Sequence, residues 1–550
     1  MKHIVKLSNM NNTIYKFNDP KNEPAFVYSK NSTTRNKLNL ELDRLSNAKI
    51  EIPLIIGGKE VRTGVMGKIV MPHDHKKVLA HYHMATEKEV IMAIDAAMKA
   101  KKEWEDISWV VRASITLKAA ELISKKYRYT INAATMLGQS KNIYQAEIDA
   151  ACETIDFLRH NAFFASKIYE NQPKSDFDQL NRMEYRPLEG FVLAISPFNF
   201  TAIASNLNMS PVLMGNTTIW KPASTAIFSN YFLMKIFKEA GLPDGVINFI
   251  PGSGSVIGNT ALDHKDLGGV HFTGSNNTFN NIWKRIANNL ENYKSYPRIV
   301  GETGGKDFIV VHASANPDEV ATAIIRGSFE YQGQKCSAAS RSYIPKSLWP
   351  EIKSILLRMK SEIKVGDVRE FPNFVNAVID EKAFDDIMGY VNFAKDSDEA
   401  EIVFGGTGDK SVGYFVEPTL ILTTNPHFET MEKEIFGPVM TIYLYDDEKF
   451  EETLDLCDQT SPYALTGAIF ATDRYIVAQA CEKLRYAAGN FYINDKPTGA
   501  MVGMQPFGGA RGSGTNDKAG SDFNLLRWIS PRTIKETFVP ASDFKYPFMK

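Results

Sequence analysis

The chain has few cysteines, no excess of charge of either sign and no long apolar run. Its four cysteines, Cys152, Cys336, Cys457 and Cys481, are scattered over 550 residues without a C-x-x-C pair. This argues against a disulfide framework or a structural zinc site and indicates a reducing compartment, so no metal site is predicted. A net charge of -1 provides no global positive field for nucleic acid or an anionic membrane. We expect a small-molecule substrate, with no nucleic-acid partner and no membrane partner.

The N-terminus lacks the apolar block of a secretory signal. Residues Met1 to Lys16 carry lysines and no acidic residue, but also no arginine, so a mitochondrial transit peptide is only weakly supported. The compartment stays open: the cytoplasm if the source is bacterial, the mitochondrial matrix if it is eukaryotic. With 44% hydrophobic and 23% charged residues, the composition is that of an ordinary globular protein, and the length predicts two or three closely packed domains.

Local patterns divide the chain. The first fifty or so residues are polar and predict an arm lying over a neighbouring surface. Thr86 and Glu89 form a T-x-x-E capping box at the start of a helix. A second long helical stretch covers "QAEIDAACETIDFLRHNAFFASKIY", and the polar break that begins at Pro173 predicts a projecting β-hairpin.

From Gly190 onward, short apolar runs alternate with helical stretches. The runs are "FVLAIS", "NTTIWKP", "VINFIPG", "GGVHFTGS" and "DFIVVH". Fully apolar strands in a strand-helix-strand repetition predict a doubly wound parallel sheet of the Rossmann type, covered on both faces. A second α/β region follows Cys336, with "SYIPKSLWPEIKSILLRMK", "VMTIYLY" and "GAIFAT" as its elements.

Polar residues follow three of these runs, where ligands bind in open α/β sheets. Asn199 supplies a side-chain N–H donor, Lys221 a cation for a ribose or phosphate, and Gly274-Ser275 a helix N-terminus suited to a pyrophosphate. "PGSGSVIG" has the spacing G-x-G-x-x-x-G instead of the usual dinucleotide fingerprint. It is equally well explained as a Gly-rich turn that packs a helix on the sheet.

Cys336 differs from the other three cysteines, which lie within apolar helical patterns. It is flanked by Gln334, Lys335 and Ser337, so we expect an exposed, stabilised thiolate and predict that Cys336 is a nucleophile. Glu302 lies 336 − 302 = 34 residues earlier on the Gly-rich turn "GETGGKDF". The glycines of this turn, Gly301, Gly304 and Gly305, predict a close approach of the backbone to another group.

These segments together resemble the aldehyde dehydrogenase superfamily. Its recurring elements occur in order from about Ile55 to the C-terminus: "SPFNF", "WKPAS", "FTGS", "GETGGKD", "GQKCSA", "EIFGPV", "NFYIND" and "PFGGARGSG". Within the superfamily, "QAEIDAA", "SPFNFTAIASNL", "FEYQGQKCSA", "AAGNFYINDKPTG" and "QPFGGARGSGTNDKAG" are most similar to the single-function glutamate-γ-semialdehyde dehydrogenases.

The resemblance implies NAD-dependent oxidation of L-glutamate γ-semialdehyde to L-glutamate in proline catabolism. It implies that Cys336 attacks the aldehyde, that Asn199 and the Cys336 backbone N–H hold the oxyanion, and that Glu302 activates the water that hydrolyses the thioester. The cofactor positions implied are Ser196, Lys221, Gly274, Ser275, Glu434 and Phe436. The substrate positions implied are Ser337, Gly499, Ala500, Phe200 and Phe507. Ser224 replaces the acidic residue of many NAD-selective members, and Ala500 replaces a serine frequent in the subfamily.

The fold implied is α/β, with residues 1-50 as an N-terminal arm, 51-170 and 191-300 as an NAD-binding domain, and 301-500 as a catalytic domain. Residues 171-190 and 505-550 would form a β oligomerisation element and C-terminal segment, with "RMEYRPLEG" and "PRTIKETFV" pairing copies into a homodimer or dimer-based assembly. Transient contact with a proline dehydrogenase is a further expectation. Two alternatives stay open: oxidation of another small aldehyde, and a non-catalytic binding or structural protein with the same fold.

Overall fold

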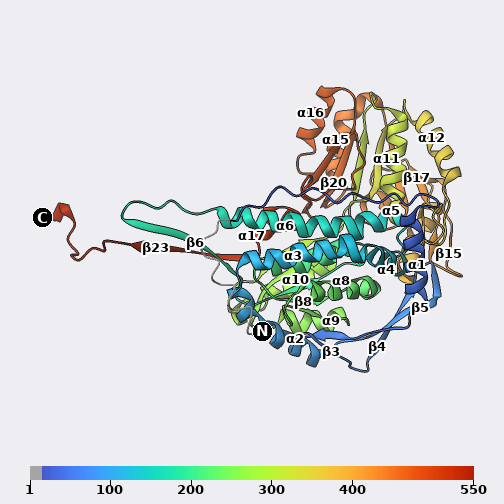
Figure 1. Ribbon diagram of the computed structural model, residues 1–550. Helices are drawn as coiled ribbons and strands as arrows, with labels where there is room; N and C mark the ends of the chain where they lie inside the picture. Colours follow the sequence, from blue (N-terminus) through green and yellow to red (C-terminus); the bar gives the residue numbers. More distant parts are fainter. Residues whose placement is uncertain (1–14, 550) are drawn as a thin grey trace.

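The computed structural model describes residues 15–549 of the chain, with two seven-stranded sheets as its framework (Figure 1). The first sheet has the order β11-β10-β7-β8-β9-β2-β3. Five neighbouring strands, from the β11 edge inward, are parallel: β7 (Phe191–Ile195), β8 (Thr218–Lys221), β9 (Ile247–Phe249), β10 (Leu267–Thr273) and β11 (Arg298–Glu302). At one edge, β2 (Leu54–Ile56) and β3 (Lys59–Val61) run antiparallel.

Helices cover both faces of this sheet. Consecutive strand residues point to opposite faces, and since both sets are largely apolar, each face is buried by helices. Ile219 packs in one apolar cluster with Val90 of α2, whereas its neighbour Trp220 packs in another with residues of α4 and α8. One face carries α2 (Glu87–Asp106), α9 (Gly254–Leu262) and α10 (Asn276–Ala287). The other carries α3 (Trp109–Leu122), α4 (Arg128–Gln139), α7 (Thr201–Leu213) and α8 (Ile227–Ala240). The predicted doubly wound arrangement is confirmed.

The capping box at the start of α2 is also confirmed. The Thr86 backbone N–H donates to the Glu89 carboxylate at 3.0 Å, and the Thr86 side chain accepts from the third helical residue. These contacts satisfy donors that the first helical turn leaves without partners. Of the described helices, none combines the length and apolar character needed to cross a membrane.

The second sheet has the order β14-β17-β18-β13-β12-β20-β21, and only β14 is antiparallel. Its strands are β12 (Asp307–Val311), β13 (Ala339–Pro345), β14 (Ala400–Phe404), β17 (Thr419–Thr423), β18 (Val439–Tyr445), β20 (Thr466–Phe470) and β21 (Asn490–Ile493). Its covering helices are α11 (Pro317–Phe329), α12 (Trp349–Glu362), α13 (Glu381–Lys395), α15 (Phe450–Gln459) and α16 (Arg474–Lys483). The apolar run "DFIVVH", read as a continuation of the first sheet, therefore belongs to the second.

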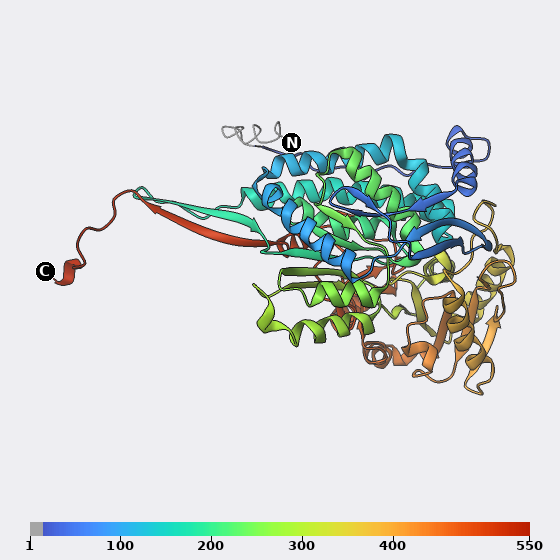
Figure 2. The ribbon, with the colours of Figure 1, turned by 90° about the horizontal axis from the view of Figure 1, so that it is seen from below.

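Two strands from opposite parts of the chain form an extension that projects from the body (Figures 1 and 2). Strand β6 (Gln179–Pro187) pairs antiparallel with β23 (Ile529–Thr537), in a register that joins Pro187 to Ile529. The predicted projecting hairpin is present as a tight reversal, since Asp176 and Gln179 form an antiparallel bridge with reciprocal backbone hydrogen bonds of 3.1 and 3.3 Å. The regular strand partner of β6 is, however, β23. The ladder is closed by the C-terminal strand, a long-range pairing that local turn residues do not encode.

The first fifty residues contain more regular structure than their polarity suggests. Helix α1 (Thr33–Asn47) begins at Ser32, whose hydroxyl accepts from the Arg35 N–H at 3.2 Å, and it buries Leu38, Leu42 and Leu45. A small sheet follows, with β1 (Ile50–Ile52), β4 (Met66–Met71) and β5 (Asp74–His83). Residues 15–32 run as an irregular extended segment. The transit-peptide expectation falls almost entirely on residues 1–14, which lie outside the described range.

The predicted helix over residues 145–169 is interrupted by a π-helical stretch. It consists of α5 (Ile143–Ala146), the π-helix η3 (Glu147–Cys152) and α6 (Glu153–Glu170). A second π-helix, η2 (Ile123–Tyr127), separates α3 from α4. Such insertions often accompany functional sites. The remaining short strands and helices are β15 (Gly408–Asp409), β16 (Phe415–Val416), β19 (Tyr463–Ala464), β22 (Ala510–Arg511), α14 (Glu429–Glu432) and α17 (Asp522–Leu526).

Candidate active site

A cavity of about 730 Å³ opens at the carboxyl ends of β7, β8 and β10. It contains eight of the predicted catalytic and cofactor positions, because parallel strands deliver the residues that follow them to one edge of the sheet. These are Ser196, Asn199, Lys221, Gly274, Ser275, Cys336, Glu434 and Phe436. The Gly-rich turn also lines it through Gly254, Ser255 and Gly258, a location that favours the functional reading of "PGSGSVIG".

Lys221 and Ser196 lie on adjacent strands of the cavity wall. The Ser196 N–H donates to the Lys221 carbonyl at 3.1 Å, and the Ser196 hydroxyl accepts from the Trp220 indole at 2.9 Å. Burial lowers the pKa of the Lys221 ammonium. An anionic or hydroxyl-bearing ligand would offset the free-energy cost of burying the charged ammonium by accepting its hydrogen bonds.

Gly274 and Ser275 connect β10 to α10. Ser275 caps the twelve-residue helix by accepting from the Thr278 N–H at 3.3 Å. The first turn of α10 thus lies at the cavity, where its unpaired N–H groups and the helix dipole favour an anion.

The turn after β11 brings Glu434 close to the main chain. Its Oε1 accepts from the Gly305 N–H at 2.9 Å, and a Cβ at Gly304 would lie only 2.0 Å from its Oε2. A Cβ at Gly305 would lie 2.3 Å from the Cys336 carbonyl oxygen. The close approach predicted from these glycines is confirmed. Burial raises the pKa of Glu434 to about 7, although the Gly305 N–H favours the carboxylate.

The segment before Cys336 adopts a strained conformation held by side-chain anchors. Tyr331 and Gln332 have φ values of 50° and 55°, in the left-handed region that costs non-glycine residues energy. The Tyr331 hydroxyl donates to the Gln139 carbonyl at 3.0 Å, and the Gln332 amide donates to the Ala377 carbonyl at 2.8 Å. These contacts anchor the segment before Cys336 to the end of α4 and to the loop that precedes α13.

The environment of Cys336 differs from the expected exposed thiolate. Its side chain is buried, with 8% of its surface exposed, and burial together with Glu302 and Asp307 raises the pKa of the thiol well above its usual range. Lys335 does not stabilise the thiolate, since its ammonium lies 3.5 Å from the Glu330 carboxylate. The prediction of a stabilised thiolate is therefore wrong, because the turn that presents Cys336 is packed inside the protein.

Asn199 follows β7 and lines the cavity, whereas Glu302 ends β11 directly before the lining residues Thr303 and Gly304 and does not itself line it. The Asn199 side-chain N–H donates to the Gln334 carbonyl at 3.0 Å, which fixes the amide beside the nucleophile segment. Burial, with a smaller effect of Asp517, raises the pKa of Glu302 to about 8. The backbone of Glu302 bridges to Gly514, so the C-terminal segment fixes this residue from the other side.

The predicted substrate loop meets the residue after the nucleophile. The Ser337 hydroxyl donates to Thr498 Oγ1 at 3.0 Å, and the Lys496 ammonium donates to the Thr498 carbonyl at 2.8 Å. Gly499 and Ala500 follow directly, and Gly499 has φ 96°, a left-handed conformation that suits glycine. The first residue of the predicted substrate loop, Thr498, is thus held against Ser337.

The two predicted aromatic positions lie on different segments. Phe200 precedes α7, and the Lys141 ammonium lies 4.0 Å from the centre of its ring. Phe507 belongs to the C-terminal segment, where its backbone bridges to Ala519. The described contacts connect Phe200 to the nucleophile segment through Tyr331, whose ring lies 4.3 Å from the same ammonium.

A cluster of buried charges beside this pocket was missed from the sequence. The fully buried Lys141 pairs with Asp149 at 2.5 Å, and burial lowers the pKa of Lys141 to about 8. Burial and Asp149 raise the pKa of Glu153 well above its usual range, while Lys141 and, more weakly, Lys335 act in the opposite direction. The signal was present, since "QAEIDAACETID" places four acidic residues in a mostly apolar helix.

The chain belongs to the aldehyde dehydrogenase family, whose sequence pattern matches residues 63–534. It is 54% identical to the mitochondrial Δ1-pyrroline-5-carboxylate dehydrogenase of Dictyostelium discoideum, over 96% of each chain. It is 48% identical to the human mitochondrial enzyme of the same name, over 96% of this chain and 94% of that one. The NAD-bound crystal structure of the Mycobacterium tuberculosis Δ-pyrroline-5-carboxylate dehydrogenase superposes with a TM-score of 0.95 at 49% identity, covering 98% of this chain and all of that one.

Proposed function

We propose that the protein oxidises L-glutamate γ-semialdehyde, formed from Δ1-pyrroline-5-carboxylate, to L-glutamate with NAD as the oxidant. The observation that carries this proposal is the position of Cys336 between two ligand regions. On one side lies the cavity at the strand ends. On the other lie Ser337 and the Thr498–Ala500 loop that it contacts. The buried Lys141–Asp149 pair, which influences Glu153, is joined to the nucleophile segment through the Tyr331 ring, 4.3 Å from the Lys141 ammonium.

The cavity residues fit a dinucleotide. The volume of about 730 Å³ suits a molecule of that size, Lys221 is a buried cation, and α10 presents free N–H groups. We assign Lys221 and Glu434 to the riboses, Gly274 and Ser275 to the pyrophosphate, and Ser196 and Phe436 to the walls. When bound, NAD would accept the hydride that leaves the reacting carbon.

Cys336 acts as the nucleophile through its thiolate sulfur, which forms a bond to the aldehyde carbon. Because burial raises the pKa of the thiol, its proton must leave as the carbon–sulfur bond forms. We assign this proton to solvent water, so that Glu302 stays a carboxylate for the later hydrolysis step. The oxygen that becomes negative is held by the Cys336 N–H and by Asn199, whose Nδ2 keeps a second hydrogen after donating to Gln334.

Glu302 then activates the water that hydrolyses the thioester. The carboxylate removes a proton from water, the hydroxide oxygen bonds to the acyl carbon, and the carbon–sulfur bond breaks to release the acid and the Cys336 thiolate. With the pKa of Glu302 at about 8, the fraction of the active base increases as the pH rises from 7 to 9. The rate should therefore increase over the same range.

The charged end of the substrate is proposed to bind opposite the cofactor. Ser337 and the backbone N–H groups at Gly499 and Ala500 suit the α-carboxylate, and Glu153 suits the α-ammonium group. Burial and then the neighbouring Asp149 raise the pKa of Glu153, and a bound ammonium group would act in the opposite direction by stabilising the carboxylate. Phe200 and Phe507 are assigned to the methylene groups.

A substrate panel tests the proposal. Steady-state rates are measured for glutamate semialdehyde, succinic semialdehyde and simple aliphatic aldehydes, each with NAD and NADP. We expect the highest kcat/KM with glutamate semialdehyde and NAD. Preference for another aldehyde would contradict the substrate assignment, and folded protein that reduces NAD with none of them would favour a non-catalytic role. Equal use of NADP would identify Ser224 as permissive.

We also propose that copies pair into a homodimer through the β6–β23 extension. Its strands and the residues around them expose Phe177, Leu180, Phe538 and Val539 on a two-stranded ribbon that has no independent core. Light scattering should show a dimer or a larger assembly built from dimers. Transient contact with a proline dehydrogenase, which would hand over a labile intermediate, is the further partner we propose.

The division into domains is part of the same proposal. Residues 51-170 with 191-300 form the NAD-binding unit, 301-500 form the catalytic unit, and 171-190 with 505-550 form the oligomerisation element. The named relatives include mitochondrial proteins of eukaryotes, which supports the mitochondrial matrix for a eukaryotic source and the cytoplasm for a bacterial one.

A further inference from the structure

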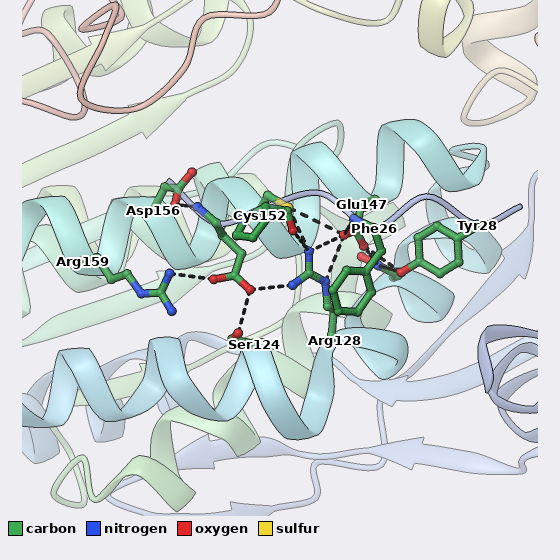
Figure 3. A network of polar contacts seen from close by, with 11 residues as sticks. Phe26, Tyr28, Ser124, Arg128, Glu147, Cys152, Asp156 and Arg159 are labelled. Atoms are coloured by element: carbon green, nitrogen blue, oxygen red, sulfur yellow. Dashed lines mark hydrogen bonds and ion pairs between the residues drawn. The ribbon is translucent and has the colours of Figure 1, made fainter. Parts of the chain in front are cut away.

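The extended segment Asn22–Tyr28 lies across the start of α6 and is held there by buried charges (Figure 3). The Arg128 guanidinium donates to the Glu23 carboxylate at 2.6 Å and to the Pro24 carbonyl at 2.6 Å, and it also pairs with Glu147. Arg159 binds the second Glu23 oxygen at 2.6 Å. The side chain of Glu23 is only 8% exposed, so these are buried contacts that fix the segment firmly.

A second set of contacts fixes the segment to the π-helix η3. The Phe26 N–H and the Tyr28 hydroxyl donate to the two oxygens of Glu147, at 2.7 Å and 2.8 Å. Glu147 is the first residue of η3, and Glu153 follows the last. The extended segment therefore holds the start of the π-helix that leads to the Glu153 carboxyl.

Asn22 connects two elements of the proposed substrate pocket directly. Its side-chain amide donates to the Asp156 carboxylate of α6 at 3.0 Å and to the Val502 carbonyl at 2.9 Å. The Glu23 N–H donates to the other Asp156 oxygen at 2.7 Å. Asp156 lies three residues after Glu153, and Val502 lies two residues after Ala500.

The position of Val502 makes this link relevant to binding. Its side chain is buried against Phe157 of α6 and Ala202 of α7, so the end of the substrate loop is packed between these two helices. The other end of the loop is fixed at Ser337 by Thr498. Gly499 and Ala500 lie between these two fixed points, Thr498 and Val502. Asn22 holds the second of them through the Val502 carbonyl.

We infer that Asn22 and Glu23 are positioning residues that set the distance between α6 and the substrate loop, and so determine the affinity for aldehydes with an α-amino-acid end. The inference rests on the proposed function. Neither residue contacts Cys336 or the cofactor cavity. An aldehyde without an amino-acid end does not use Glu153 or the loop, so its turnover should be insensitive to both residues.

The test compares Asn22→Ala with Asn18→Ala, a change at an exposed asparagine that lies just before the segment. With glutamate semialdehyde, Asn22→Ala should raise KM and lower kcat/KM about tenfold, as expected for the loss of two hydrogen bonds. With propionaldehyde, kcat/KM should change less than about twofold, within ordinary surface effects. Asn18→Ala should resemble the parent protein with both aldehydes.

A second variant and a binding measurement keep the inference falsifiable if Asn22→Ala weakens the fold. Glu23→Gln keeps the backbone contact to Asp156 but loses the charge, and L-glutamate, the product, is tested as a competitive inhibitor in every variant. A higher inhibition constant for L-glutamate with an unchanged inhibition constant for NADH supports the inference. Equal losses with both aldehydes, or no loss in either variant, would overturn it. If the parent protein itself prefers propionaldehyde, the proposed function fails instead.

Discussion

The cofactor side and the substrate side of Cys336 are built in different ways. On the cofactor side, Asn199, Lys221 and Gly274 lie at the carboxyl ends of parallel strands of one sheet, so the backbone topology alone brings them together. On the substrate side, Glu153, Ser337 and the loop at Ala500 come from separate elements joined by side-chain contacts and buried charges. The difference indicates that dinucleotide binding depends on local motifs, whereas substrate selection depends on long-range packing.

The largest loss of activity is expected from substituting Cys336, where the cofactor side and the substrate side meet. Cys336→Ala removes the sulfur that must bond to the aldehyde carbon, so NADH formation should fall by more than about 10⁴-fold with every aldehyde. The measurement is steady-state absorbance of NADH. Cys481→Ala, at an exposed cysteine, is the matched control and should retain full activity. Substantial dehydrogenase activity in Cys336→Ala would contradict the assignment of Cys336 as the nucleophile.

Glu302→Gln should come next and should separate two steps. Without the base, hydrolysis of the thioester slows by about 10²-fold or more, while one turnover of NADH can still appear as a burst. In the parent protein the steady-state rate should rise through a pKa of about 8, because the carboxylate is the active form. Stopped-flow traces between pH 6.5 and about 9 check both points. A variant that keeps the same pH dependence would show that another group titrates.

Lys221→Ala tests whether the cofactor side can be weakened alone. Loss of a charged hydrogen bond should raise the KM for NAD about tenfold or more. The KM for glutamate semialdehyde should stay within about twofold of its original value, because Lys221 lines the cofactor cavity and the loop residues Thr498–Ala500 do not. Equal changes in both constants would contradict the separation of the two sides.

Ala500→Ser is the smallest change and tests the substrate side alone. A serine hydroxyl would add one hydrogen bond to the substrate carboxylate, so KM for glutamate semialdehyde should fall about two- to fivefold. The KM for NAD and the rate with propionaldehyde should not change. An increase in the KM for glutamate semialdehyde would place the carboxylate elsewhere.

Much of the fold and of the cofactor side was predictable from the sequence. Apolar runs such as those of β7 and β8 are unambiguous, and the residue after each run lies at a known edge of the sheet. The capping box of α2 is equally local. The pairing of β6 with β23 was not predictable from local patterns, because β23 lies more than 300 residues later in the chain. Only the family resemblance grouped the two segments in one β element.

The substrate side was only partly predictable, for a related reason. Ser337 and the Gly499-Ala500 loop were recognised from motifs, but the role of Asn22 depends on Asp156 and Val502, which are brought to it by tertiary packing. The acidic residues of η3 and α6 were visible in the sequence without their partner Lys141. The buried state of Cys336 was also hidden, since its polar neighbours Gln334 and Lys335 bind other parts of the protein.

One measurement tests the central claim, that Cys336 joins an NAD site to a site for an amino-acid aldehyde. Glu302→Gln protein is mixed with glutamate semialdehyde and NAD, quenched in acid, digested and analysed by mass spectrometry. We predict a glutamyl thioester on the peptide that contains Cys336, formed only when NAD is present. No adduct, or an adduct on Cys152, Cys457 or Cys481, would contradict the account.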